Sequence, residues 1–141
     1  MKPARRRRTS SSASVRVGAD LIHIDAVRDS IERFGARYLD RVFTAAEIEY
    51  CQRSESEQHQ RFAARFAAKE ATLKVLRPDQ RWLDWRSIEV IKTPGGWCEI
   101  KLHGAAEVLA EHAGVAALSV SLSHEDSYAL AMVSATIYDG V

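Results

Sequence analysis

Two carboxylates and several cations in this sequence have the residue types and spacing of a site for a phosphorylated ligand. Asp20 follows a short apolar run, and Glu70 lies in a helical pattern with Lys74 one turn later. Magnesium binds proteins through one or two carboxylates and completes its octahedron with water and substrate phosphate oxygens. Nearby cations then balance the remaining phosphate charge. The same spacing is also common in a structural ion pair between Glu70 and Lys74 at i and i+4.

The helix that carries these groups, expected at about 58–76, has charges in unusual places. Its apolar stripe consists of Phe62, Phe66, Leu73 and Leu76. Lys69 lies in the middle of this stripe, and Arg65 and Glu70 lie at its edges. The opposite side consists of the small residues Ala64, Ala68 and Ala71. Because burying a charge is costly, we expect from Lys69 alone that its aliphatic stem follows the apolar face and that its ammonium stays in solvent.

The first half of the chain must bring Asp20 to this helix. Residues 15–22 read as a strand that ends in an acid, and Asp20 by itself is typical of a turn. Gly18 indicates that another backbone approaches the strand closely. A helix over residues 24–34 ends at Gly35, a helical turn follows around Leu39, and a capping box over residues 44–47 starts a further helix.

The second half predicts strands at 88–92 and 97–102, joined by a Thr-Pro-Gly-Gly turn, then a helix at 104–112. Strands at 117–123 and 128–136 close the chain. In the first of these, serines alternate with apolar residues, and a serine face indicates solvent, a subunit interface or a polar site. We expect the three tryptophans to pack in the core or at its edge. This order of elements predicts an α+β domain with a mixed, largely antiparallel sheet around a long central helix.

The composition limits the classes of function that are possible for this protein. The 141 residues suit one domain, expected at 15–141, after a basic leader at 1–14 that we expect to be disordered. The leader holds five basic residues and no acid, so the rest carries 15 basic and 19 acidic residues, a charge of −4. This mildly acidic body argues against general nucleic-acid binding, which needs a basic face. Nothing approaches the ~20 apolar residues of a membrane span. Cys51 and Cys98 have neither paired nor metal-ligand spacing, which favours the cytoplasm.

Several familiar sites are absent from the sequence. It contains no P-loop, dinucleotide fingerprint, zinc cluster or Gly-x-Ser-x-Gly elbow. The five histidines show no metal-ligand spacing. Taken alone, His124 at a strand end is typical of a turn residue.

Three motifs resemble those of the holo-acyl-carrier-protein synthases, which are small 4′-phosphopantetheinyl transferases. Residues 18–24, Gly-Ala-Asp-Leu-Ile-His-Ile, resemble the start of that family. Residues 65–74, Arg-Phe-Ala-Ala-Lys-Glu-Ala-Thr-Leu-Lys, resemble its Arg-Phe-Ala-x-Lys-Glu-Ala-x-x-Lys signature. Residues 121–125, Ser-Leu-Ser-His-Glu, resemble its Ser-hydrophobic-Ser-His-acid strand end. The resemblance spans residues 15–136, with the three motifs in order.

The resemblance implies an enzyme that moves 4′-phosphopantetheine from coenzyme A to a serine of an apo-acyl carrier protein and releases adenosine 3′,5′-bisphosphate. It implies that Asp20 and Glu70 bind Mg²⁺, bridged to the coenzyme A pyrophosphate. Lys74 would contact the transferring phosphate or protonate the leaving group. The base that takes the serine proton would be Glu70 or a water on the metal.

The resemblance also implies roles for the flanking residues and an assembly. Arg65 and Lys69 would support coenzyme A binding or orient Glu70. The assembly would be a homotrimer with sites between protomers, in which Ser123 and His124 face the site from the adjacent protomer.

Two departures from the family pattern bear on specificity. The usual Gly-Thr-Gly loop after the long helix is Arg77-Pro78-Asp79 here, and an arginine six residues after the first aspartate is Ala26, with Arg28 nearby. The first departure affects coenzyme affinity. The second affects the choice between fatty-acid, polyketide and other carriers. Together they leave a second hypothesis, a module that binds coenzyme A or the carrier but is catalytically impaired.

Overall fold

The computed structural model describes residues 12–79 and 82–139. The strands are β1 (Ala13–His23), β2 (Ile88–Lys92), β3 (Cys98–Leu102), β4 (Val115–His124) and β5 (Tyr128–Tyr138). The helices are α1 (Ile24–Phe34), α2 (Ala36–Val42), α3 (Ala45–Gln52), α4 (Gln58–Leu76) and α5 (Gly104–His112), with a 3₁₀ turn at Trp85–Ser87. The elements predicted from the sequence are confirmed. β1 begins two residues before the predicted start, and residues 1–11 of the leader lie outside the described residues.

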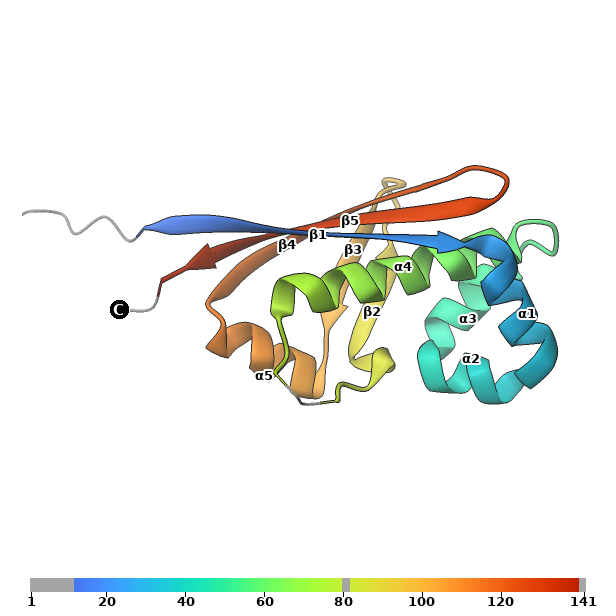
Figure 1. The fold of residues 1–141 in the computed structure, drawn as a ribbon, viewed down its shortest axis with the longest axis horizontal. Helices are drawn as coiled ribbons and strands as arrows, with labels where there is room; N and C mark the ends of the chain where they lie inside the picture. The colour runs from blue at the N-terminus through green and yellow to red at the C-terminus, as the bar shows by residue number, and fades with distance from the viewer. Residues whose placement is uncertain (1–11, 80–81, 140–141) are drawn as a thin grey trace, which may run out of the picture.

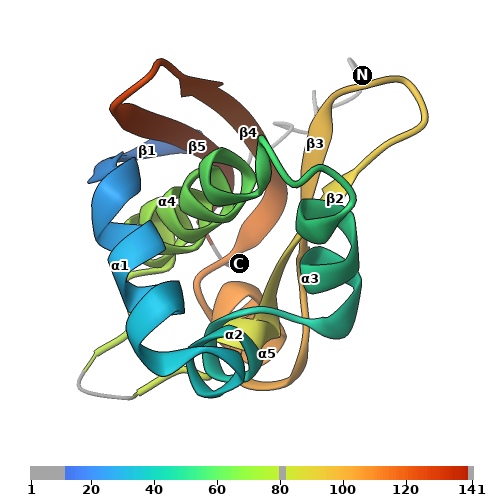
Figure 2. The same ribbon diagram turned by 90° about the vertical axis from the view of Figure 1, so that its right-hand side faces the viewer.

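Two antiparallel sheets and the helix between them form the body of the protein. One sheet has the order β1-β5-β4, and the other is the β2-β3 hairpin. Figure 1 shows α4 running along the first sheet, with α1, α2 and α3 gathered at one end. Figure 2, which looks along α4, shows the hairpin standing beside it, on the side where α3 lies. This is the α+β fold with a central helix that the sequence predicts.

Helix α4 is buried on several sides, as its residues predict. Phe62 and Leu76 lie in the core, and the alanines of the other side are also buried. Gly18 explains how β1 can lie so close, because a Cβ there would collide with the carbonyl oxygen of Ala71. The close approach predicted for Gly18 is confirmed, and it brings the inner face of β1, with Asp20, against α4.

The small helices follow local signals. Gly35 ends α1 in a left-handed conformation (φ 55°) that favours glycine. Thr44 accepts a hydrogen bond from the Glu47 backbone while the Glu47 side chain accepts one from the Thr44 backbone, so the predicted capping box starts α3. None of the helices in the described ranges is long and apolar enough to cross a membrane.

Two local predictions are wrong. Asp20 is not a turn residue, since β1 continues to His23 and pairs Asp20 with Ala131 of β5. Trp82 and Trp97 are 68% and 60% exposed rather than packed in the core. Trp97 follows the Gly95-Gly96 turn of the hairpin, where little protein surrounds it. Trp85 does pack as expected, with its ring edge-on to Phe66.

The outer face of the three-stranded sheet is apolar on two strands and polar on the third. The exposed apolar side chains on β1 and β5 are Val15, Val17, Leu21, Tyr128, Leu130, Met132 and Tyr138. The serines of β4, at 119, 121 and 123, are exposed as well. An apolar face of this extent is typical of an interface.

Candidate active site

Lys69 and Glu70, adjacent on α4, point to different environments. The Lys69 side chain is completely buried. Its Nζ donates to Glu47 Oε1 at 2.7 Å, to the Trp85 carbonyl at 3.1 Å and to the Ile88 carbonyl. The predicted ammonium in solvent is therefore wrong. All three protons of this ammonium are directed to these interior acceptors, so any support that Lys69 gives to coenzyme binding would be indirect.

Asp20, Glu70 and Lys74 come together where β1 crosses the far part of α4. Lys74 Nζ lies 3.3 Å from Asp20 Oδ1 and donates to the Ala19 carbonyl at 2.7 Å. The Lys74 side chain is half exposed, whereas that of Asp20 is 13% exposed. In the described residues, Lys74 pairs with Asp20 and not with Glu70, so the simple i,i+4 ion pair is not what occupies this place.

The carboxylates of this group are under-compensated. Burial raises the pKa of Glu70, the nearby Asp20 carboxylate raises it further, and Lys74 opposes both effects. Asp20 Oδ2 is buried and has no hydrogen-bond partner in the described part of the chain. An orphaned buried carboxylate oxygen beside a second carboxylate has the donor chemistry of a divalent-cation site. The magnesium site implied by the resemblance therefore fits these residues.

Asp20 and Glu70 are the two side-chain ligands that the described residues bring to this place. Within residues 12–79 and 82–139 no group of three or more His, Cys, Asp or Glu side chains could hold a metal ion. Two carboxylates, with water and phosphate oxygens in the other positions, are the arrangement that Mg²⁺ takes with phosphorylated substrates.

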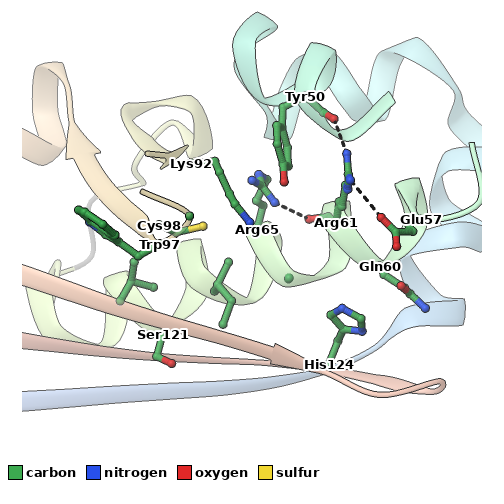
Figure 3. Close-up of a pocket in the computed structure, with 14 residues that line it drawn as sticks. Tyr50, Glu57, Gln60, Arg61, Arg65, Lys92, Trp97, Cys98, Ser121 and His124 are labelled. Carbon is green, nitrogen blue, oxygen red and sulfur yellow. Dashed lines mark hydrogen bonds and ion pairs between the residues drawn. The ribbon is translucent and has the colours of Figure 1, made fainter. Parts of the chain in front are cut away.

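A second group of cations lies on another face of α4. A pocket of about 410 Å³ is lined by Arg61 and Arg65 of α4, Lys92 at the end of β2 and His124 at the end of β4. Figure 3 shows these side chains, with Trp97 and Ser121, around the same space. Asp20, Glu70 and Lys74 do not line this pocket. Within one chain, the structure brings Arg65 to His124 and separates both from the carboxylates.

Tyr50 organises the arginines of this pocket. The guanidinium carbons of Arg61 and Arg65 lie 4.7 and 4.2 Å from the centroid of its ring. Arg61 also donates to the Tyr50 carbonyl at 3.1 Å. Arg65 is 4% exposed, and its Nε is buried with no partner in the described residues. Two guanidiniums stacked on one ring offer donors to an anion, and Arg61 also pairs with the Glu57 carboxylate at 3.0 Å at the edge of the same pocket.

The sequence matches one family over most of its length. Residues 16–133 match the 4′-phosphopantetheinyl transferase superfamily. A holo-[acyl-carrier-protein] synthase of Koribacter versatilis is 42% identical over 82% of this chain and 93% of its own. The protein belongs to this family. A second holo-[acyl-carrier-protein] synthase, of Gloeobacter violaceus, is 41% identical over 84% of this chain and 90% of its own.

Solved structures of the family have the same fold. An ACPS–CoA complex from Chronobacterium ammoniagenes has a TM-score of 0.79 at 27% identity and covers 90% of this chain and 99% of its own. A Helicobacter pylori holo-[acyl-carrier-protein] synthase in complex with coenzyme A has a TM-score of 0.73 at 26% identity, covering 88% of this chain and all of its own. The resemblance seen in the motifs is confirmed.

Sequence reasoning missed part of the cationic pocket. Arg61 stands one turn before Arg65, so its position on the same side of α4 could have been found from helical spacing alone. Lys92 and Trp97 gave no such signal, because only the three-dimensional position of the hairpin brings them to α4. Ser123 adjoins His124 on β4 but does not line this pocket; it lines a shallow hollow with Leu21 and Leu130.

One departure from the family pattern has a structural counterpart. Arg77, in place of the first residue of the Gly-Thr-Gly loop, ends α4 in the left-handed conformation (φ 52°). Glycine adopts this conformation without strain, whereas arginine does not.

Proposed function

We propose that this protein transfers 4′-phosphopantetheine from coenzyme A to a serine of an apo-acyl carrier protein. The observation that carries the proposal is the under-compensated pair Asp20–Glu70 beside Lys74. The family to which the chain belongs, and the coenzyme A complexes of its structural neighbours, support the same reaction.

The reaction is a substitution at phosphorus. The carrier serine Oγ forms a bond to the β-phosphorus of coenzyme A, and the bond from that phosphorus to the bridging oxygen breaks. Adenosine 3′,5′-bisphosphate leaves with the electron pair. The serine proton passes to Glu70 or to a water, and both remain candidates. Such reactions depend mainly on positioning and on neutralising phosphate charge.

Asp20 and Glu70 would hold a magnesium ion, which supplies Lewis-acid polarisation of the pyrophosphate. Lys74, half exposed beside Asp20, would bind the transferring phosphate or donate a proton to the leaving group. The side chains themselves supply fixed charge where negative charge develops.

The cationic pocket would receive the nucleotide end of the coenzyme. Coenzyme A carries a pyrophosphate and a separate phosphate on its ribose. If the pyrophosphate lies at Asp20 and Glu70, the ribose phosphate must be bound elsewhere. Arg61, Arg65 and Lys92 offer it guanidinium and ammonium donors, and His124 stands at the edge. The exposed Trp97 ring lies beside the same space.

We propose a homotrimer in which a complete site forms between protomers. The two groups of charged residues lie on different faces of α4 in one chain, so the carboxylates of one copy would meet Arg65, Ser123 and His124 of the next. The apolar outer face of the sheet supports such an assembly. The working domain would be residues 15–141. Two free cysteines accord with a cytoplasmic location.

A mass assay tests the proposal. The protein is incubated with coenzyme A, Mg²⁺ and a panel of apo-carriers of fatty-acid, polyketide and peptide types. The expected result is the mass of phosphopantetheine added to at least one carrier, and its loss when EDTA is added. Transfer to none of them would refute the enzyme, and coenzyme binding without transfer would establish the catalytically impaired module instead.

A further inference from the structure

Strand β2 has an edge that no strand within residues 12–79 and 82–139 covers. Ser87 and Thr93, at its two ends, exchange backbone hydrogen bonds with His103 and Trp97 on the β3 side. Because successive residues of a strand direct their backbone groups to alternate edges, Ile88 and Val90 direct theirs away from β3. The sheet has only two strands, so this second edge would be bare in the protein interior. A buried bare edge is costly.

The ion pair of Glu47 and Lys69 takes the place of the missing strand. Val90 N donates to Glu47 Oε2 at 3.0 Å, and Lys69 Nζ donates to the Ile88 carbonyl. A neighbouring strand would supply one acceptor and one donor at this position, and the carboxylate and the ammonium supply the same two. Both side chains are fully buried. The other Glu47 oxygen accepts from Thr44 N at 2.9 Å as well as from Lys69, so the pair is satisfied on all sides.

This attachment lies close to the cationic pocket at both ends. On α4, Lys69 stands one turn after Arg65, which lines the pocket. On the hairpin, the held residues Ile88 and Val90 lead directly to Lys92, which lines the pocket from the other side. The pair therefore ties α4 to β2 between Arg65 and Lys92, although neither partner faces the pocket.

We infer that Lys69 and Glu47 are positioning residues for nucleotide binding: they replace a neighbouring strand along β2 and thereby hold Lys92 opposite Arg65. The inference rests on the proposed function for the identity of the ligand as coenzyme A. It gives Lys69 of the signature helix a part in coenzyme affinity without any contact with the coenzyme.

The alternative is a pair that only adds stability. Buried ion pairs frequently contribute little net stability over an apolar replacement, so stability alone gives weak reason for this arrangement. The two roles differ in what they change. Lower stability reduces the amount of folded enzyme and so the apparent kcat, whereas a displaced hairpin raises the KM for coenzyme A in the molecules that remain folded.

The experiment compares Lys69→Met and Glu47→Gln with the control Thr72→Val. Thr72 is equally buried on α4, but its hydroxyl bonds only to the Ala68 carbonyl of its own helix. Hydrogen exchange across residues 88–98 is measured without coenzyme, and KM and kcat are measured at a temperature where every variant is folded. Glu47→Gln keeps the shape of the side chain and serves if Lys69→Met does not fold.

The expected result is faster exchange at Val90 and a KM for coenzyme A raised about tenfold, a smaller effect than the ~10²-fold that a 1 Å misplacement of reacting groups can cause. kcat at saturating coenzyme stays near the wild-type value, and the control changes neither quantity. Unchanged exchange, or faster exchange with an unchanged KM, would overturn the inference. If the wild-type protein does not use coenzyme A, the exchange result still decides whether the pair holds β2, so the two failures are distinguishable.

Discussion

Two groups of charged residues, each with a lysine and at least one carboxylate, lie side by side along α4. They differ in whether all of their charges and hydrogen-bonding atoms have partners. Lys69 and Glu47 are buried, and their charges and hydrogen-bonding groups are matched by each other and by backbone. Asp20, Glu70 and Lys74 are partly exposed, and one Asp20 oxygen has no partner within the described residues. Residue type does not separate the two groups, since both contain a lysine and a glutamate.

The difference teaches how to distinguish structure from function among charged residues of one motif. A network that is satisfied internally needs nothing else, and its removal is expected to harm the fold. A network with an unmatched carboxylate is complete only when a ligand arrives, so its removal is expected to harm the reaction and relieve the fold. Each prediction below tests one side of this contrast.

The largest expected effect is on stability, at the complete group. Lys69→Met leaves Glu47 as a buried charge without its counterion, and such changes cost ~3–5 kcal/mol. Chemical denaturation at neutral pH measures the loss, with Thr72→Val as the control. A loss below about 1 kcal/mol, the size of an ordinary point substitution, would contradict the contrast.

The next effect is on catalysis, at the incomplete group. Glu70→Gln removes one of the two proposed metal ligands, and we expect the Mg²⁺-dependent transfer rate to fall on the order of 10²–10³-fold, as when a single electrostatic stabiliser is lost. The protein should remain folded. Holo-carrier formation followed by mass spectrometry measures the rate, and Glu111→Gln, an exposed acid on α5, is the control. Wild-type turnover in Glu70→Gln would refute the role assigned to Glu70.

A smaller effect follows from the close approach of β1. Gly18→Ala places a methyl group against the Ala71 carbonyl and must push β1 from α4, at a cost of ~1–3 kcal/mol. Because Asp20 lies two residues further on the same face, Mg²⁺-dependent transfer should fall while hydrogen exchange at Val90 is unchanged. Ser14→Ala, exposed on the same strand, is the control. Faster exchange at Val90 would mean that displacing β1 also disturbs the Lys69–Glu47 pair, so that the two groups of charged residues are not independent.

The pH dependence of stability tests the incomplete group without a metal. Burial and the Asp20 charge raise the pKa of Glu70 above 4.5, so the folded state binds its proton more tightly than the unfolded state. Stability in EDTA should therefore fall as pH rises from 4.5 through the raised value. Glu70→Gln removes this decline. Thermal unfolding across pH measures it, and added Mg²⁺ should restore wild-type stability at pH 7. A wild-type pH profile identical to that of Glu70→Gln would contradict the raised pKa of Glu70 and the two causes given for it.

The smallest effect lies at the end of α4, beyond both groups. Arg77→Gly relieves a left-handed arginine (φ 52°) and should stabilise the fold by about 0.5–1 kcal/mol. Denaturant unfolding measures the gain. A similar KM for coenzyme A before and after the change would show that this departure from the family loop does not set coenzyme affinity.

Local signals gave most of the fold. The bounds of α4 follow from apolar periodicity and Pro78, the start of α3 from its capping box, and the hairpin from its Gly-Gly turn. These patterns act between residues that are close in sequence, so they can be recognised without knowing the three-dimensional structure. The left-handed arginine at 77 had no such signal, because glycine is the residue that normally marks this conformation.

Long-range pairing limited what could be predicted of the site. Glu47 was identified as a helix cap, but its bond to Lys69, 22 residues away, depends on how α3 packs against α4. Trp97 was expected in the core or at its edge, whereas the hairpin carries it outward. The roles of Asp20 and Glu70 came from the resemblance, and the structure adds the unmatched oxygen that makes the pair chemically plausible.

The adjacency of Lys69 and Glu70 restricts how the gene for this protein can change. A helix turns by about 100° per residue, so one codon deleted between Arg65 and Lys69 would rotate every later side chain of α4 by that angle. The carboxylate would then move toward the interior position opposite Glu47, and the ammonium would leave it. Loops of this chain can lengthen or shorten with little penalty, but the segment from Arg65 to Lys74 should tolerate substitution far better than any change of length. A library of single-codon deletions would display this as a sharp gap in recovered activity.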